Sequence, residues 1–132
     1  MSARVAADDD AALLRQGYLA CQRITREHGT TYYWGARLLP RERRRHVYAV
    51  YALARLADDI VDDAAGRTVA QTEAALDEFE ARFWSALAAG GSPEPVLAAV
   101  VSSIRACRLE DECFARFFGA MRQDLSCAAY PT

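Results

Sequence analysis

One segment, from about residue 41 to 63, constrains the fold more than any other, because its charges follow helical spacing. At about 100° per residue, Tyr51, Arg55, Asp58 and Asp62 fall within an arc of about 60°. Apolar residues occupy nearly all the rest of the circumference. An ordinary surface helix has one apolar stripe and a broad polar face. This pattern instead predicts a helix inside a bundle, with carboxylates that face the interior and need a partner there.

The remaining sequence divides into helical segments separated by short breaks. Helices are expected over about 9–28, 70–89, from Pro93 onward and from about 110, with a non-helical joint over 29–35. The three aspartates at 8–10 suit the positive N-terminal end of the first helix. Ser92 and Pro93 fit a cap and a first helical position. No stretch alternates long enough to indicate a strand. The predicted class is all-α, a single helical domain over residues 1–132.

Composition excludes several classes of protein. With 52% hydrophobic and 26% charged residues, the chain is too apolar to be disordered. Its net charge of −2 provides no overall basic field for nucleic acid. No run is long and apolar enough for a membrane span, and the acidic N-terminus is unlike a signal peptide. A cytoplasmic protein is expected, and this compartment and the cysteine spacing predict four reduced, buried thiols. The lack of a CxxC pattern argues against a structural zinc site.

Two interpretations of the charged arc remain open from its spacing. In one, Arg55 forms an ion pair with Asp58 or Asp62 and the other charges face water. In the other, Asp58 and Asp62 hold a hard divalent cation, with Asp59 at the margin, while Arg55 binds phosphate oxygens.

Two further clusters are interpreted conservatively. The arginines at 41, 43, 44 and 45 are more typical of a solvated helix start than of an anion site. Phe114, Phe117, Phe118 and Met121 are more typical of a core than of a cofactor wall.

The ordered combination of several segments resembles the squalene/phytoene synthase family. The segments are residues 21–32, 37–40 and 48–62, and the similarity continues through 93–96 to 121–125. It covers almost the whole chain from about residue 18. The resemblance implies a helical bundle of the all-α terpenoid synthase type. Because the family's second aspartate motif is absent, it also implies that residues 1–132 are the N-terminal part of a longer, truncated domain.

The resemblance also assigns roles to particular residues. It implies that Asp58 and Asp62 are catalytic carboxylates that bind Mg²⁺, with Mn²⁺ as the alternative ion, and that Asp59 belongs to the same motif. Substrate-binding roles fall on the following side chains: Thr31, Tyr32, Tyr51, Arg55 and Asp124.

The implied activity is that of a transferase in isoprenoid and carotenoid biosynthesis. It joins two prenyl diphosphates, geranylgeranyl or farnesyl, head to head after metal-assisted ionisation. The phytoene type, which is favoured, needs no reductant, whereas the squalene type uses NADPH. The alternatives are a catalytically incomplete fragment and a non-catalytic helical binding or assembly module. A truncated chain would expose apolar surface and self-associate, and a lipid product favours peripheral membrane contact.

Overall fold

The computed structural model describes residues 3–62 and 66–129, with side chains described over 9–62 and 66–125. These ranges form helices α1 (Ala3–His28), α2 (Thr30–Ala36), α3 (Arg41–Asp62), α4 (Val69–Ala89), α5 (Pro95–Cys107) and α6 (Asp111–Ala129). No strand occurs within them, which confirms the all-α prediction. None of these helices is both long and apolar enough to cross a membrane.

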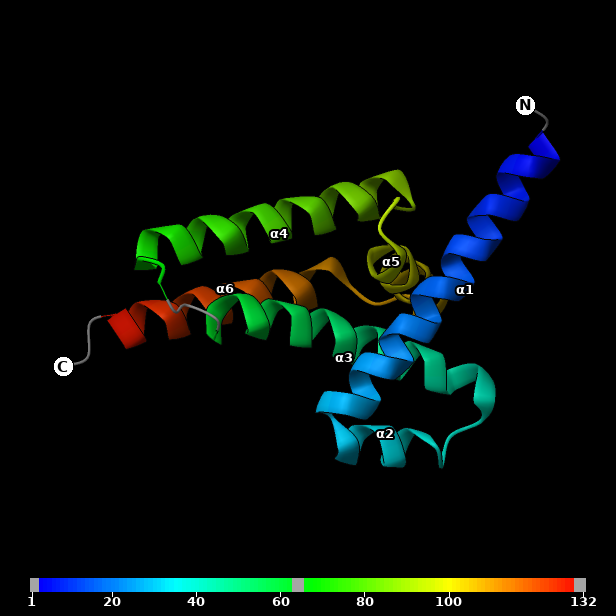
Figure 1. Cartoon of the computed structure of the whole chain (residues 1–132), viewed down its shortest axis with the longest axis horizontal. Helices are drawn as coiled ribbons and strands as arrows, with labels where there is room; N and C mark the ends of the chain where they lie inside the picture. The colour runs from blue at the N-terminus through cyan, green and yellow to red at the C-terminus, as the bar shows by residue number, and fades with distance from the viewer. Residues whose placement is uncertain (1–2, 63–65, 130–132) are drawn as a thin grey trace.

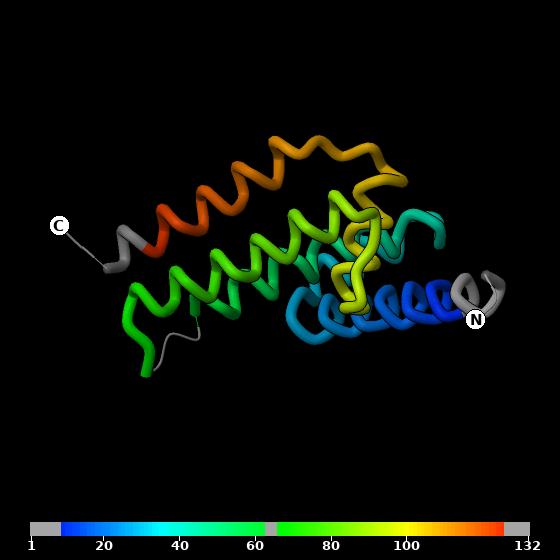
Figure 2. Tube along the Cα trace, turned by 90° about the horizontal axis from the view of Figure 1, so that it is seen from above, coloured from blue at the N-terminus to red at the C-terminus, as the bar shows by residue number. Residues whose placement is uncertain are grey.

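Helix α3 is the centre of the molecule and packs against each of the other five helices. Figure 1 shows α4 and α6 extending along α3, while α1 crosses it near α5. The view from above separates α1, on one side, from α4 and α6 on the other (Figure 2). Side chains from α1, α3, α4, α5 and α6 meet in one apolar core, and its largest fully buried members are Leu53, Leu76, Phe83, Leu97, Val100, Val101 and Phe118.

Three helix ends show how the sequence sets the boundaries. The hydroxyl of Thr68 and the amide of Gln71 form a reciprocal capping box at the start of α4. Gly90 ends α4 in the left-handed conformation that glycine adopts without strain. Helix α5 begins at Pro95 rather than at Pro93, because Ser92 caps a short turn by accepting a hydrogen bond from the Glu94 backbone N–H at 3.0 Å.

Helix α1 begins earlier than expected, at Ala3, so that Asp9 and Asp10 lie within the helix and not at its positive end. The end of α3 agrees with expectation as far as Asp62, and the predicted last residue, Asp63, lies outside the described residues.

The predicted joint over 29–35 was wrong, because residues 30–36 form the short helix α2. Its glycine, threonines and aromatic residues have low helix propensity, which is why the segment was expected to be irregular. Packing of this segment against α3 stabilises the helix instead. Tyr33 is buried and stacks on Tyr48 of α3, with ring centroids 5.7 Å apart. The carbonyl oxygen of Gly29 accepts a hydrogen bond from the Tyr33 backbone N–H, which begins the helical bonding of α2.

The cysteines are free where they are described, but only Cys21 is buried; Cys107 and Cys113 are exposed. The side chain of Cys127 lies outside the described residues. Burial raises the pKa of the Cys21 thiol to about 12. The prediction of buried thiols is therefore correct for Cys21 and wrong for the other two described cysteines.

Alkylation of the native chain should distinguish these thiols by position. Because only the thiolate reacts and the Cys21 pKa is raised, Cys21 should carry about a thousandfold less thiolate at pH 8 than an ordinary exposed cysteine. Peptide mass mapping after iodoacetamide treatment should find Cys107 and Cys113 modified first, with Cys21 modified only near pH 12 or after unfolding in urea. Equal labelling of native Cys21 and Cys113 at pH 8 would contradict the burial.

Candidate active site

The charged arc predicted from the sequence exists on α3, but it is not enclosed by the described residues. Tyr51 and Arg55 are half-buried, whereas Asp58 and Asp62 are exposed. The expectation that both carboxylates face a closed interior was therefore wrong for this part of the chain. The physical reason is that the apolar circumference of α3 is covered on the sides packed by the other helices, and the end of the helix that carries the two aspartates projects past α1 (Figure 1).

Carboxylates from two helices share this face. Asp124 of α6 lies close enough to Asp58 for its charge to act on that group. The pKa of Asp58 is raised, mainly by partial burial, and further by the negative charges of Asp62, Asp59 and Asp124; Arg55 opposes the shift. Asp58, Asp62 and Asp124 thus form an acidic face in which the neighbouring negative charges disfavour ionisation of Asp58.

The donor chemistry of the acidic face suits a hard cation. Its side-chain donors are carboxylate oxygens, which Mg²⁺ prefers, and a dication would offset their mutual repulsion. Asp58 and Asp62 stand one helical turn apart and can offer oxygens to one ion. The described residues nevertheless contain no group of three His, Cys, Asp or Glu side chains already placed to hold a metal. Asp58 and Asp62 supply the one or two carboxylates that Mg²⁺ usually takes from a protein, with water and phosphate oxygens as its other ligands.

Arg55 is oriented by a carboxylate that neither sequence interpretation chose. Its guanidinium pairs with Asp59 at 3.0 Å, and not with Asp58 or Asp62. The two residues are one helical turn apart, and their side chains are 33% (Arg55) and 46% (Asp59) exposed. A pair this exposed orients Arg55 more than it stabilises the fold. Arg55 Nε is buried and has no hydrogen-bond partner among the described residues. The Arg55 guanidinium is thus held beside the acidic face, where its charge acts on Asp58.

The junction of α1 and α2 lies against the same stretch of α3. The rings of Tyr32 and Tyr51 are 5.4 Å apart and tilted. A Cβ at Gly29 would overlap Cζ of the Tyr51 ring and lie 2.7 Å from its Cε2 and 2.8 Å from its hydroxyl oxygen, so only glycine admits this approach. Tyr32 and Thr31 are exposed. The structure therefore brings Tyr32 and Tyr51 together, while Thr31 lies beside them without a described contact to the acidic face.

An apolar pocket of about 240 Å³ opens on the flank of the charged arc. Ala54 lines it, one turn before Asp58. Val50 and Ala54 belong to the apolar circumference predicted for this helix, but the sequence gave no sign of a pocket. It favoured an ordinary core for Phe114 and Phe117. Phe114 is indeed buried, and it also lines the pocket. The complete lining is Val50, Leu53, Ala54, Leu109, Cys113, Phe114 and Phe117.

Comparison with known proteins identifies the family. The model of the squalene/phytoene synthase family matches residues 25–132, which include the α1–α2 junction, the charged arc and Asp124. The chain belongs to the squalene/phytoene synthase family. The match places every candidate site residue within the family region.

Curated members of this family cover most of the chain. A phytoene synthase of Arthrospira platensis is 33% identical over 116 residues, which is 87% of this chain and 36% of that protein. A 15-cis-phytoene synthase of Synechocystis sp. is 28% identical over 92% of this chain and 35% of its own length. A chloroplastic phytoene synthase of Daucus carota is 31% identical over 95% of this chain and 32% of its own. The chain spans about a third of the length of these relatives.

Proposed function

We propose that this chain supplies the first aspartate motif and part of the substrate surface of a transferase that condenses two prenyl diphosphates head to head. The observation that carries the proposal is the placement of Asp58 and Asp62, one turn apart, beside an apolar pocket in a member of this family. A prenyl diphosphate has two chemically distinct ends. The acidic face suits its metal-bound diphosphate, and the apolar pocket suits its hydrocarbon tail.

Each side chain has a role that its position allows. Asp58 and Asp62 would hold Mg²⁺, or Mn²⁺ as the alternative, and Asp59 at the edge of the motif would hold Arg55 in place. Arg55 would bind diphosphate oxygens through donors that its pair with Asp59 leaves free. Asp124, on α6, would complete the acidic face.

Tyr32 and Tyr51 would present aromatic faces where positive charge develops on the allylic carbon, and Thr31 would lie at the same edge. When bound, the metal supplies Lewis acidity that neutralises charge on the leaving diphosphate. The protein's own contribution is to orient the diphosphate, offer ring electrostatics and keep water from the hydrocarbon tail.

The type of product is part of the same proposal. The relatives carry the name phytoene synthase, which favours a phytoene-type product made without a reductant over a squalene-type product that requires NADPH. Geranylgeranyl or farnesyl diphosphate would be the substrate. Exposed apolar side chains, including Leu38 at 89% exposure and Val50 at 38%, would support self-association or contact with a lipid surface.

Binding and turnover need separate measurements, because the chain spans about a third of its relatives. Isothermal titration of the chain with a non-hydrolysable geranylgeranyl diphosphate analogue should show a binding step with Mg²⁺ that disappears in EDTA. Incubation with geranylgeranyl and farnesyl diphosphates, followed by product analysis, then tests turnover. Binding without a product would identify a catalytically incomplete portion. Binding of equal strength with Mg²⁺ and in EDTA, or no binding, would contradict the proposed function.

A substitution at Gly29 should separate the substrate surface from the fold. In Gly29→Ala the new methyl group overlaps the far end of the Tyr51 side chain, which can rotate away, so stability should change little. The Tyr32–Tyr51 arrangement would be lost, and misplacement of a substrate-positioning group should weaken Mg²⁺-dependent analogue binding about tenfold.

Gly35→Ala is the matched control, because nothing lies within 4 Å of the added Cβ at this neighbouring position in α2. It should leave analogue binding unchanged. Equal affinity of the Gly29→Ala variant and the unmodified chain would remove Tyr51 from the substrate surface.

A further inference from the structure

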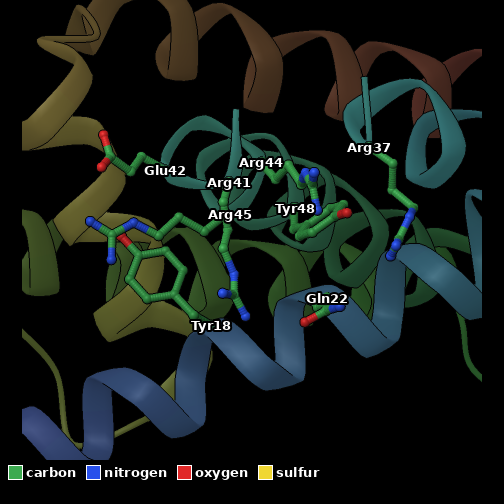
Figure 3. A pocket seen from close by; sticks show the side chains of 8 residues that line it. All are labelled: Tyr18, Gln22, Arg37, Arg41, Glu42, Arg44, Arg45 and Tyr48. Atoms are coloured by element: carbon green, nitrogen blue, oxygen red, sulfur yellow. The ribbon is translucent and has the colours of Figure 1, made fainter. Parts of the chain in front are cut away.

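A second concave site lies at the opposite end of α3 from the acidic face. The cleft has a volume of about 780 Å³ and is enclosed by α1, the end of α2 and the first turns of α3. This volume is within the range of small-molecule sites. Figure 3 shows Tyr18 and Gln22 rising from α1, with arginine side chains around the hollow. Its lining residues are Tyr18, Gln22, Arg37, Arg41, Glu42, Arg44, Arg45 and Tyr48.

The charge of the cleft is strongly positive and uncompensated. Four of its eight lining residues are arginines and one, Glu42, is acidic. Among the described residues, no carboxylate lies within ion-pair distance of any of these four guanidinium groups. Elsewhere in the described part of the chain, ion pairs are formed by Arg55, Arg82, Arg116 and Arg122. The cleft therefore concentrates positive charge where a mixed surface would have neutralised it.

Several of these arginines are held in place by other groups. Arg37 donates a hydrogen bond to the Tyr33 hydroxyl at 3.2 Å, and Arg44 donates one to the Leu39 carbonyl oxygen at 3.0 Å. The guanidinium of Arg45 lies over the Tyr18 ring, 5.0 Å from its centroid. These contacts occupy some donors and leave others directed at the cleft, so part of the entropic cost of ordering the side chains is already met. The positive end of the α3 dipole points the same way.

We infer that this cleft binds a phosphate-bearing anion, through the guanidinium groups of Arg41 and Arg45 with Arg37 and Arg44 at its sides. Guanidinium groups match phosphate oxygens in geometry and charge. From Arg45 to Asp58, about 20 Å of helix separates the proposed anion ligands from the acidic face, at a rise of about 1.5 Å per residue. The site is therefore distinct from the proposed metal-dependent one and does not rest on the proposed function. It also reverses the sequence prediction that this arginine run is only a solvated helix start.

The test is carried out in EDTA, which removes the divalent cation that the acidic face would need to bind a phosphate. In EDTA, inorganic diphosphate titrated into the chain should bind without a metal. A parallel experiment measures how much of the chain sediments with vesicles of phosphatidylglycerol and phosphatidylcholine. Vesicles of phosphatidylcholine alone are the comparison. Arg41→Gln with Arg45→Gln should weaken binding about tenfold or more, because charge-assisted hydrogen bonds are lost. Arg23→Gln with Arg43→Gln removes the same charge outside the cleft lining and is the matched control.

Three results are informative. Diphosphate binding that the cleft variant weakens and the control retains would support a site for a soluble phosphate. Binding to phosphatidylglycerol vesicles alone, with the same dependence on the cleft arginines, would support a lipid headgroup as the source of the phosphate. Absence of both kinds of binding, or equal weakening by the control pair, would overturn the inference and leave only diffuse surface charge.

Discussion

Replacing both carboxylates of the charged arc, in Asp58→Asn with Asp62→Asn, should abolish Mg²⁺-dependent binding of a prenyl diphosphate analogue. The substitutions keep side-chain volume and remove the two charges that would hold the cation. Loss of groups that merely orient a metal ligand costs 10- to 100-fold, so loss of both ligands should cost about 100-fold or more in affinity. Titration calorimetry at fixed Mg²⁺ measures this directly.

Stability should respond differently in the same variant. Asp58 has a raised pKa because burial and the charges of Asp62, Asp59 and Asp124 disfavour its ionised form. Neutral asparagines relieve that repulsion, so the urea midpoint should stay equal or rise. A purely structural role for the two aspartates would lower it instead.

The matched control removes two negative charges elsewhere. Glu73→Gln with Glu78→Gln changes two exposed carboxylates on α4 and should leave analogue affinity unaltered. Unaltered affinity in the asparagine pair would exclude Asp58 and Asp62 as the metal site. Equal losses in both double variants would show that overall charge, and not these ligands, governs binding.

Most of the fold could be predicted because the helices are separated by residues with strong local preferences. The Gly90-Gly91 break and the capping chemistry of Thr68 mark the ends of α4 without reference to the rest of the molecule. Helix α2 could not be predicted in this way, because its helical state depends on Tyr33 stacking against Tyr48, which lies 15 residues away in sequence. Local propensity there favours an irregular segment, whereas tertiary packing favours a helix, and the packing outweighs the propensity.

For the candidate site, too, relations within one helix could be predicted and relations between helices could not. Helical spacing alone placed Tyr51, Arg55, Asp58 and Asp62 on one side of α3, because that relation is internal to one helix. Spacing does not determine exposure, which depends on the helices that cover α3, and the two aspartates are exposed. It also does not choose among partners at i+3, i+4 and i+7, and Arg55 pairs with Asp59. The approach of Asp124 to Asp58 joins two helices and is visible only in three dimensions.

The crossing of α1 over α5 is another relation between distant segments, and it depends on a single missing side chain. A Cβ built at Gly17 would overlap the carbonyl oxygen of Pro95 and lie 2.7 Å from its carbonyl carbon and 3.2 Å from the Ala99 Cβ. The first two atoms are backbone and belong to the first turn of α5, so no side-chain rotation can relieve the overlap. The hydrogen bond between the Tyr18 hydroxyl and Ser103, at 2.9 Å, fixes the same pair of helices about two turns further along α5.

Gly17→Ala should therefore be among the most destabilising single-methyl changes in the chain. Forcing α1 away from α5 should cost about 3 kcal/mol or more, against a gain of about 1 kcal/mol in helix propensity. For a domain of this size the midpoint of thermal unfolding should fall by about 10 °C. Gly119→Ala is the matched control, because it lies within α6 with nothing within 4 Å of the added Cβ; it should raise stability by about 1 kcal/mol. Denaturant unfolding of both variants, followed by circular dichroism, should thus show changes of opposite sign. Stabilisation by Gly17→Ala would mean that α1 and α5 do not cross in backbone contact, and the arrangement of α1 against the rest of the bundle would have to be rebuilt.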